Sequence, residues 1–126
     1  MKNIILIVGF LSFTLVSFAT ERVGFLKISD GREVLVEAIS QKTLYIFDKD
    51  KNGESACHGP CLITWPALVL ETGEGITEPF SVLLRDDNVL QLQLDDKPLY
   101  FFAGDTLPGQ MNGDGLGGTW HIITRE

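Results

Sequence analysis

Residues 42–50 read KTLYIFDKD and residues 97–105 read KPLYFFAGD, so one pattern of lysine, leucine, tyrosine, phenylalanine and aspartate returns after 55 residues. The only two tryptophans of the chain, Trp65 and Trp120, are separated by the same 55 residues. One spacing shared by several rare residues is the signature of an internal duplication. The sequence therefore predicts two tandem repeats, at about 24–68 and 79–124, joined by a linker at 71–79.

The apolar segments around these motifs are of strand length and are bounded by Gly, Asp, Asn and Pro, which favour turns. The expected strands are 24–29, 33–39, 43–47, 80–85, 89–94, 98–102 and 120–124. One helical segment is expected near 60–68, where Pro60 suits a first turn and Pro66 cuts the helix short. The sequence thus predicts a mostly β protein with at most a short helical turn.

Each repeat is expected to form a three-stranded antiparallel meander. A meander of this size has one apolar face that cannot be buried alone, so the two copies should share one core. We expect them to pack as a sandwich or to join their sheets about a pseudo-two-fold axis. The prediction is a single domain over residues 20–126.

The amino terminus has the pattern of a signal peptide over residues 1–19. Lys2 precedes an apolar run at 4–16, and small residues at Ser17 and Ala19 fit a cleavage site. No cysteine follows the run, so no lipid anchor is predicted. The expected location is the periplasm or the extracellular medium. With a formal net charge of −7, the chain is also a poor match for nucleic acid, which requires clustered Lys and Arg.

The aromatic segments alternate so that tyrosine and phenylalanine share one face while apolar residues occupy the other. Because both faces are apolar, the strand should be interior. The aspartate three residues beyond the phenylalanine should brace the turn or accept a hydrogen bond from a nearby donor. We interpret these motif residues as core and turn. They are Tyr45, Phe47, Asp50 and Trp65 in the first repeat and Tyr100, Phe102, Asp105 and Trp120 in the second.

The arrangement resembles a bacterial family described as a secreted repeat of unknown function, whose members are predicted lipoproteins with a Yx(F/W/Y)xxD motif. The pattern occurs from Tyr45 to Asp50 and from Tyr100 to Asp105, and each copy continues into glycines and a tryptophan. The resemblance covers essentially the whole chain after the signal peptide. It implies an extracytoplasmic location and no established activity. The lipid-accepting cysteine of many members is missing here.

The segment Cys57-His58-Gly59-Pro60-Cys61 has three interpretations. A disulfide across the Gly-Pro turn is favoured by export to an oxidising compartment. Copper or zinc binding is the second, with a soft ligand set of Cys57, His58 and Cys61, joined by Met111 and His121 from the second repeat. The third is thiol redox chemistry, although redox pairs usually have two intervening residues rather than three.

Two further motifs resemble known sites only in part. Residues 48–53 match the first half of a calcium loop, but Gly59 stands where the closing glutamate belongs. Residues 113–118 contain G-x-G-x-x-G, but a strand rather than a helix is expected to follow, and the chain ends too soon for the distal acidic residue. Turns are the better interpretation of both segments.

No arrangement typical of a catalytic site can be assembled from these residues. The function expected from the sequence is therefore an exported, non-enzymatic binding or interaction module for an extracytoplasmic ligand or protein, with no cofactor. The alternative is a periplasmic copper or zinc protein, or a thiol redox protein, that uses Cys57 and Cys61.

Overall fold

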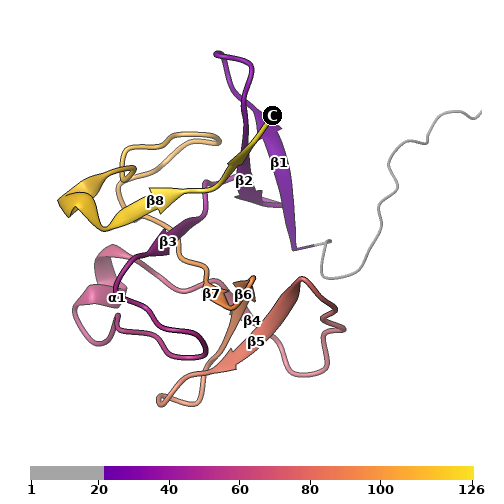
Figure 1. Ribbon diagram of the computed structural model, residues 1–126, viewed down its shortest axis with the longest axis vertical. Coiled ribbons are helices and arrows are strands. Elements are labelled where there is room, and N and C mark those ends of the chain that lie inside the picture. The colour runs from indigo at the N-terminus through magenta and orange to yellow at the C-terminus, as the bar shows by residue number, and fades with distance from the viewer. Residues whose placement is uncertain (1–21) are drawn as a thin grey trace, which may run out of the picture.

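The structure is a computed structural model that describes residues 22–126. The signal peptide predicted at 1–19 lies outside these residues. The described chain is mostly β, as expected, with three groups of strands (Figure 1). No helix among residues 22–126 has the length and apolar character needed to cross a membrane.

Each repeat begins with an antiparallel hairpin. In the first, β1 (Val23–Lys27) pairs with β2 (Glu33–Glu37), and in the second, β5 (Phe80–Leu84) pairs with β6 (Leu90–Leu94). The turns use left-handed backbone at Gly31 and Asn88, two residue types that tolerate this conformation. The central strands β2 and β6 show the same burial pattern, with three buried residues between two partly buried ones.

The hairpins are related by a shift of 57 residues, because the pair Val23 and Glu37 corresponds to the pair Phe80 and Leu94. The 55-residue spacing applies only from the aromatic strands onward. The link before the aromatic strand is two residues longer in the first repeat. The 55-residue spacing places Val34 opposite Val89, but in the paired hairpins Val34 corresponds to Gln91.

The repeats exchange their last strands. At the carboxyl end, β9 (Thr124–Arg125) pairs with β2 of the first repeat, whereas β4 (Val69–Leu70) of the first repeat pairs with β6 of the second. Each outer sheet is thus completed by a strand from the other repeat. The sequence left two arrangements open, a sandwich of two meanders or sheets joined about a pseudo-two-fold axis. The structure shows the second, with the sheets joined through exchanged strands.

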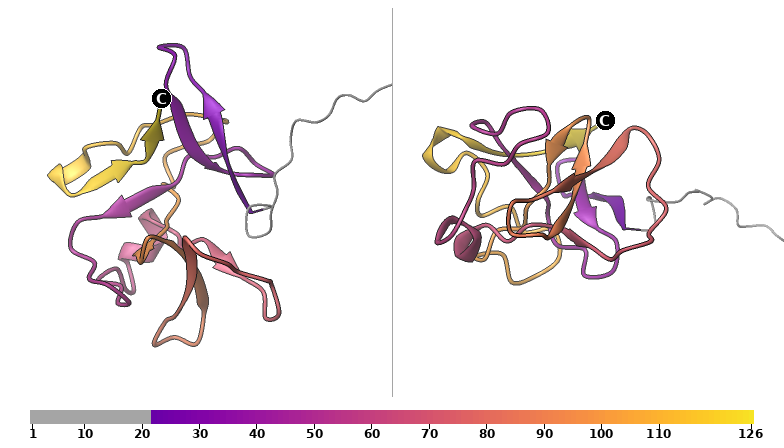
Figure 2. Two further views of the ribbon diagram at one scale, coloured as in Figure 1. Left: turned by 45° about the vertical axis from the view of Figure 1, so that its right-hand side comes forward. Right: turned by 90° about the horizontal axis from the view of Figure 1, so that it is seen from below.

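At the centre of the molecule, strands of one repeat also pair with strands of the other. There, β3 (Tyr45–Phe47) pairs with β8 (Trp120–Ile122), and the equivalent segment of the second repeat forms a bridge between Tyr100 and Ala67. Tyr45 and Tyr100 also bridge to one another, with reciprocal N–H to carbonyl distances of 2.8 and 3.0 Å. Because these two residues are repeat equivalents, the pseudo-two-fold axis passes between them. The left view of Figure 2 shows β3 between the hairpin of β1 and β2 above and the hairpin of β5 and β6 below.

Several expected elements differ in length. The strand expected at 98–102 is reduced to β7 (Lys97–Pro98), which pairs with β6, followed by the bridge at Tyr100. The helical turn is present as α1 (Cys61–Thr64), and the glycine-rich segment contains a short 3-10 turn, η3 (Leu116–Gly118).

The core divides into two clusters. One is aliphatic and lies between the outer sheets, with Leu35, Leu44, Leu92 and Leu99 among its fully buried members. The other is aromatic and is built from both motif copies; its buried members are Tyr45, Cys57, Trp65, Tyr100 and Trp120. The aromatic cluster therefore holds the two repeats together at their axis.

Candidate functional site

The motif tyrosines and aspartates pair across the repeats. The Tyr45 hydroxyl donates to Asp105 Oδ2 at 2.6 Å, and the Tyr100 hydroxyl donates to Asp50 Oδ2 at 2.8 Å. The other oxygen of each carboxylate accepts a backbone N–H, from Ala56 at 2.6 Å for Asp50 and from Asn112 at 3.0 Å for Asp105. Each aspartate thus braces its own exit turn and reaches the tyrosine of the other copy.

The motif rings form a continuous stack that crosses the pseudo-two-fold axis between the two tryptophans. Trp65 and Trp120 are parallel within 2° with ring centroids 3.8 Å apart. Phe47 stacks on the outer face of Trp120 at 4.1 Å, and Phe102 lies on the outer face of Trp65 at 4.6 Å. Tyr45 and Tyr100 then meet the edges of Trp65 and Trp120 at 5.2 and 5.1 Å. Geometries of this kind favour aromatic pairs beyond their apolar area.

The tyrosine hydroxyls and aspartate carboxylates of the two motifs already have hydrogen-bond partners within the protein. Burial and the hydrogen bond to Asp105 raise the pKa of Tyr45, and burial raises that of Tyr100. The tyrosines therefore remain protonated donors at neutral pH, and neither is poised as a general base. The symmetric centre is a structural element.

A cleft of about 350 Å³ opens where the repeats differ. One wall comes from the loop that precedes and includes the disulfide segment, and the other from the carboxyl end of β5 and its turn. His58 Nδ1 and Asp86 Oδ1 approach to 3.7 Å between these walls. The lining residues are Gly53, Glu54, Ser55, His58, Leu83, Leu84, Arg85 and Asp86.

Arg85 ties the two walls together. Its side chain is 1% exposed, and its guanidinium donates to the Cys57 carbonyl and, at 2.8 Å, to Gln91 Oε1. Gln91 in turn donates to the Leu99 carbonyl at 2.8 Å. A buried cation is tolerated only when its donors are satisfied in this way. The disulfide loop is thereby fixed to the central strand of the second repeat.

This buried polar chain exists in one repeat only. With the 57-residue shift, the positions of Arg85 and Gln91 are occupied in the first repeat by Ile28 and Val34. The cysteines likewise have no counterpart in the second repeat. The cleft therefore combines the features that break the repeat symmetry.

Ser55 connects the cleft to the symmetric centre. Its Oγ lies 2.6 Å from the Tyr100 hydroxyl and accepts the Cys57 N–H at 3.1 Å. Burial raises the pKa of Asp50, against the lowering effect of its hydrogen bonds from Ala56 and Tyr100. In the second repeat the equivalent contact to tyrosine comes from the backbone N–H of Gly113. The partly buried Ser55 is therefore the point at which this internal network reaches the lining of the cleft.

The predicted cysteine bridge is present. Cys57 and Cys61 form a disulfide with their Cα atoms 5.3 Å apart, and residues 22–126 contain no free cysteine. In this state neither sulfur is a thiolate ligand or nucleophile.

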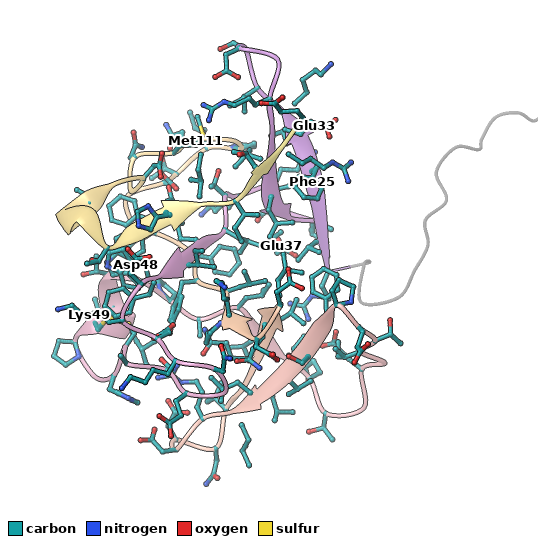
Figure 3. All side chains as sticks on the ribbon, viewed as in Figure 1. Phe25, Glu33, Glu37, Asp48, Lys49 and Met111 are labelled. Atoms are coloured by element: carbon teal, nitrogen blue, oxygen red, sulfur yellow. A yellow bond between two sulfur atoms is a disulfide. The ribbon has the colours of Figure 1, made fainter. Side chains whose placement is uncertain are left out.

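The other residues of the proposed ligand set are distributed over the surface. His58 faces Asp86, while His121 Nε2 lies 2.7 Å from Asp48 Oδ2. Met111 lies on a separate loop, well apart from Asp48 (Figure 3). Within the described chain no three His, Cys, Asp or Glu side chains are grouped so as to hold a metal ion.

The two partial motifs form turns. Lys51 and Glu54 close the first one with reciprocal backbone hydrogen bonds of 3.1 and 2.8 Å. The carboxylates of the calcium-like segment bond elsewhere, Asp48 to His121 and Asp50 to Tyr100. The glycine-rich segment turns tightly, with left-handed backbone at Gly115 and Gly117.

Sequence reasoning missed Arg85, Gln91 and Ser55. A signal for Arg85 was available, since one arginine closes an otherwise apolar strand in an acidic chain. Its partner could not have been found, because the Cys57 carbonyl is a backbone group of the other repeat, 28 residues away in the chain.

Comparison with known proteins agrees with this architecture. A family model described as a secreted repeat of unknown function matches the chain twice, over residues 29–69 and 81–124. No curated protein and no solved structure shows a significant match. The two matches fall on the two repeats and together span more than half of the chain. The chain therefore belongs to the family of secreted repeats of unknown function and carries two copies of its repeat.

Proposed function

We propose that the protein is an exported, non-enzymatic binding module whose ligand occupies the cleft between the disulfide loop and the end of β5. The observation that carries this proposal is the position of the cleft, which lies where the two repeats differ. Binding sites commonly use loops held by a rigid scaffold. Here the scaffold is the exchanged sheets, and Arg85 holds the loop to it.

The chemistry of the lining also favours binding over catalysis. Glu54 and Asp86 give the cleft acidic character, and Leu84 provides an apolar wall that is 63% exposed. The Arg85 side chain, which also lines the cleft, is 1% exposed and donates to the Cys57 carbonyl, Gln91 and Asp87. A ligand with apolar and basic groups fits this lining. We place the protein in the periplasm or the extracellular medium, in keeping with the family description.

The proposal can be tested by ligand selection on residues 20–126. Ligands selected from a displayed peptide library and a glycan array would be mapped on ¹H–¹⁵N spectra. We expect shifts at Gly53, Ser55 and His58, and binding that Asp86→Lys weakens by about tenfold or more. Glu126→Lys serves as the charge-matched control and should leave affinity unchanged.

Two results would contradict the proposal. The first is a set of ligands whose spectral changes all lie away from the cleft. The second is turnover of a substrate in a hydrolase and oxidoreductase panel at a rate that a cleft substitution abolishes.

A further inference from the structure

The outer edge of β5 is an open sheet edge. Antiparallel pairing directs the backbone groups of alternate residues toward β6, and the bonds Arg85 N–H to Val89 carbonyl and Asp95 N–H to Pro79 carbonyl show that these are the odd-numbered residues. The N–H and C=O groups of Val82 and Leu84 therefore point away from the sheet. Within residues 22–126 no hydrogen-bond partner takes either of them.

This edge lacks the usual protection against strand pairing. Natural edge strands are commonly interrupted by a charged residue, a proline or a bulge. In β5 the sequence FSVLL contains none of these, and Val82 and Leu84 are 42% and 63% exposed. The equivalent edge of the first repeat, β1, carries exposed Lys27 at the position of Leu84. Of these two equivalent edges, β1 is therefore protected against pairing with a further strand, and β5 is not.

Acidic residues lie at both ends of β5. At its carboxyl end Glu54 and Asp86 line the cleft. At its amino end a second hollow, of about 500 Å³, is lined by Glu78, Asp95 and Asp96 together with Phe80. A strand that added to this edge would pass between two negative ends. Basic residues at the ends of such a strand would be attracted to them.

The charge pattern also disfavours a second copy of this chain as the occupant. If two β5 edges paired antiparallel, the Asp86 end of one copy would lie beside the Asp95 and Asp96 end of the other. Like charges would face each other at both ends of the shared sheet, which is destabilising. A partner of opposite charge avoids this repulsion.

We infer that the β5 edge binds an extended segment of a partner protein, which joins the sheet as an added strand and carries apolar residues between basic ends. In this mode main-chain hydrogen bonds supply affinity and side-chain contacts supply specificity. The added strand would bond to Val82 and Leu84 and enter the cleft at Asp86. The inference rests on the proposed binding function and names the class of its ligand.

The probe for this inference is the acetylated and amidated peptide KKVTVTVKK, titrated into residues 20–126 by calorimetry. We expect saturable binding of one peptide per chain, with new protection of the Val82 and Leu84 amides against hydrogen exchange. Methylating the central amide nitrogens removes the backbone donors and should weaken binding by about tenfold or more. The acidic peptide EEVTVTVEE should not bind measurably.

The test variant is Leu84→Lys, which gives β5 the charge that β1 carries. It should weaken binding of KKVTVTVKK by about tenfold or more. Leu107→Lys is the matched control, since Leu107 is 60% exposed and lies on a remote loop, and it should leave the affinity unchanged. Thermal unfolding of both variants checks that neither change acts through folding.

Three results would overturn the inference. They are equal binding of the methylated peptide, equal effects of Leu84→Lys and Leu107→Lys, and a concentration-dependent dimer in sedimentation that Leu84→Lys abolishes. The last result would assign the edge to a second copy. If selected ligands still bind the cleft while KKVTVTVKK does not, the strand inference fails and the binding function stands. If no ligand maps to the cleft, both fail.

Discussion

The Tyr45 hydroxyl and the Asp105 carboxylate, which belong to different repeats, form a buried hydrogen bond of 2.6 Å. Because Tyr100 and Asp50 repeat the contact, the repeated tyrosine and aspartate of this chain interact between copies rather than within one copy. A tyrosine of one repeat is satisfied only when the other repeat is folded against it.

This contact should be energetically coupled. We expect Asp105→Ala to lower the free energy of unfolding by about 2–4 kcal/mol, because two donors, the Tyr45 hydroxyl and the Asn112 N–H, lose a charged acceptor. Combined with Tyr45→Phe in a double-mutant cycle, it should show a coupling of about 1–2 kcal/mol in denaturant unfolding. Additive effects of the two changes would contradict the pairing. Exposed Glu126→Ala is the control.

The ring stack depends on a glycine. A Cβ at Gly113 would lie 2.7 Å from the Trp65 ring and 2.9 Å from that of Phe102. Gly113→Ala should therefore destabilise the protein by about 1–3 kcal/mol and reduce the near-ultraviolet circular dichroism of the stack. Gly75→Ala, whose Cβ would have no neighbour within 4 Å, is the matched control and should change stability by less than about 0.5 kcal/mol. Equal stability of the two variants would argue against the packing described.

Strand exchange predicts that neither repeat folds as a monomer. Fragments 20–70 and 71–126 should each give the poorly dispersed ¹H–¹⁵N spectrum of an unfolded chain at low concentration, because each lacks strands that complete its sheets. Mixing them should restore the dispersed spectrum of the intact protein. A dispersed spectrum from one fragment, with a monomer mass in sedimentation, would disprove the exchange.

The buried tyrosines predict loss of stability at high pH. Both have pKa values raised above the ordinary 10.0. Above pH 10 the unfolded tyrosines ionise while the folded ones stay neutral, so the stability present below pH 10 should fall by about 1.4 kcal/mol per pH unit for each tyrosine. Absorbance at 295 nm should report ionisation only together with unfolding. Ionisation near pH 10 in the folded state would contradict the burial of both hydroxyls.

The cysteines should be unreactive in the isolated protein. A thiol reagent should detect no free thiol in residues 20–126 before reduction and both thiols after reduction in denaturant. Since the bridge closes a short loop, replacing both cysteines by alanine should lower the free energy of unfolding by about 2 kcal/mol or less. Thiols that react without reductant would favour the redox or metal alternative.

Much of this fold could be predicted from the sequence because rare residues mark the repeat. Trp65 and Trp120 fix the spacing, and the alternation around Tyr45 and Tyr100 identifies interior strands. The disulfide followed from export and the Gly-Pro turn. These features depend on local pattern and composition, which a single sequence displays directly.

The exchange of strands could not be predicted, because β4 and β9 are too short for their sequence to indicate which strand they pair with. The 57-residue shift of the hairpins was hidden for a similar reason, because Val34 and Val89 align at the spacing set by the aromatic residues. The cleft was also not predicted, because the bond that joins its walls runs from Arg85 of the second repeat to the Cys57 carbonyl of the first.

The crossing of β4 and β9 has a consequence for how such a protein could diversify. A single repeat whose last strand pairs with another copy could complete its sheets only in a homodimer. The two halves of a homodimer are always identical. Fusing the copies into one chain keeps the second repeat at a high effective concentration. The two repeats are then free to differ in sequence. One half could then acquire a bridged loop and the other an arginine to hold it, while the shared axis stayed unchanged.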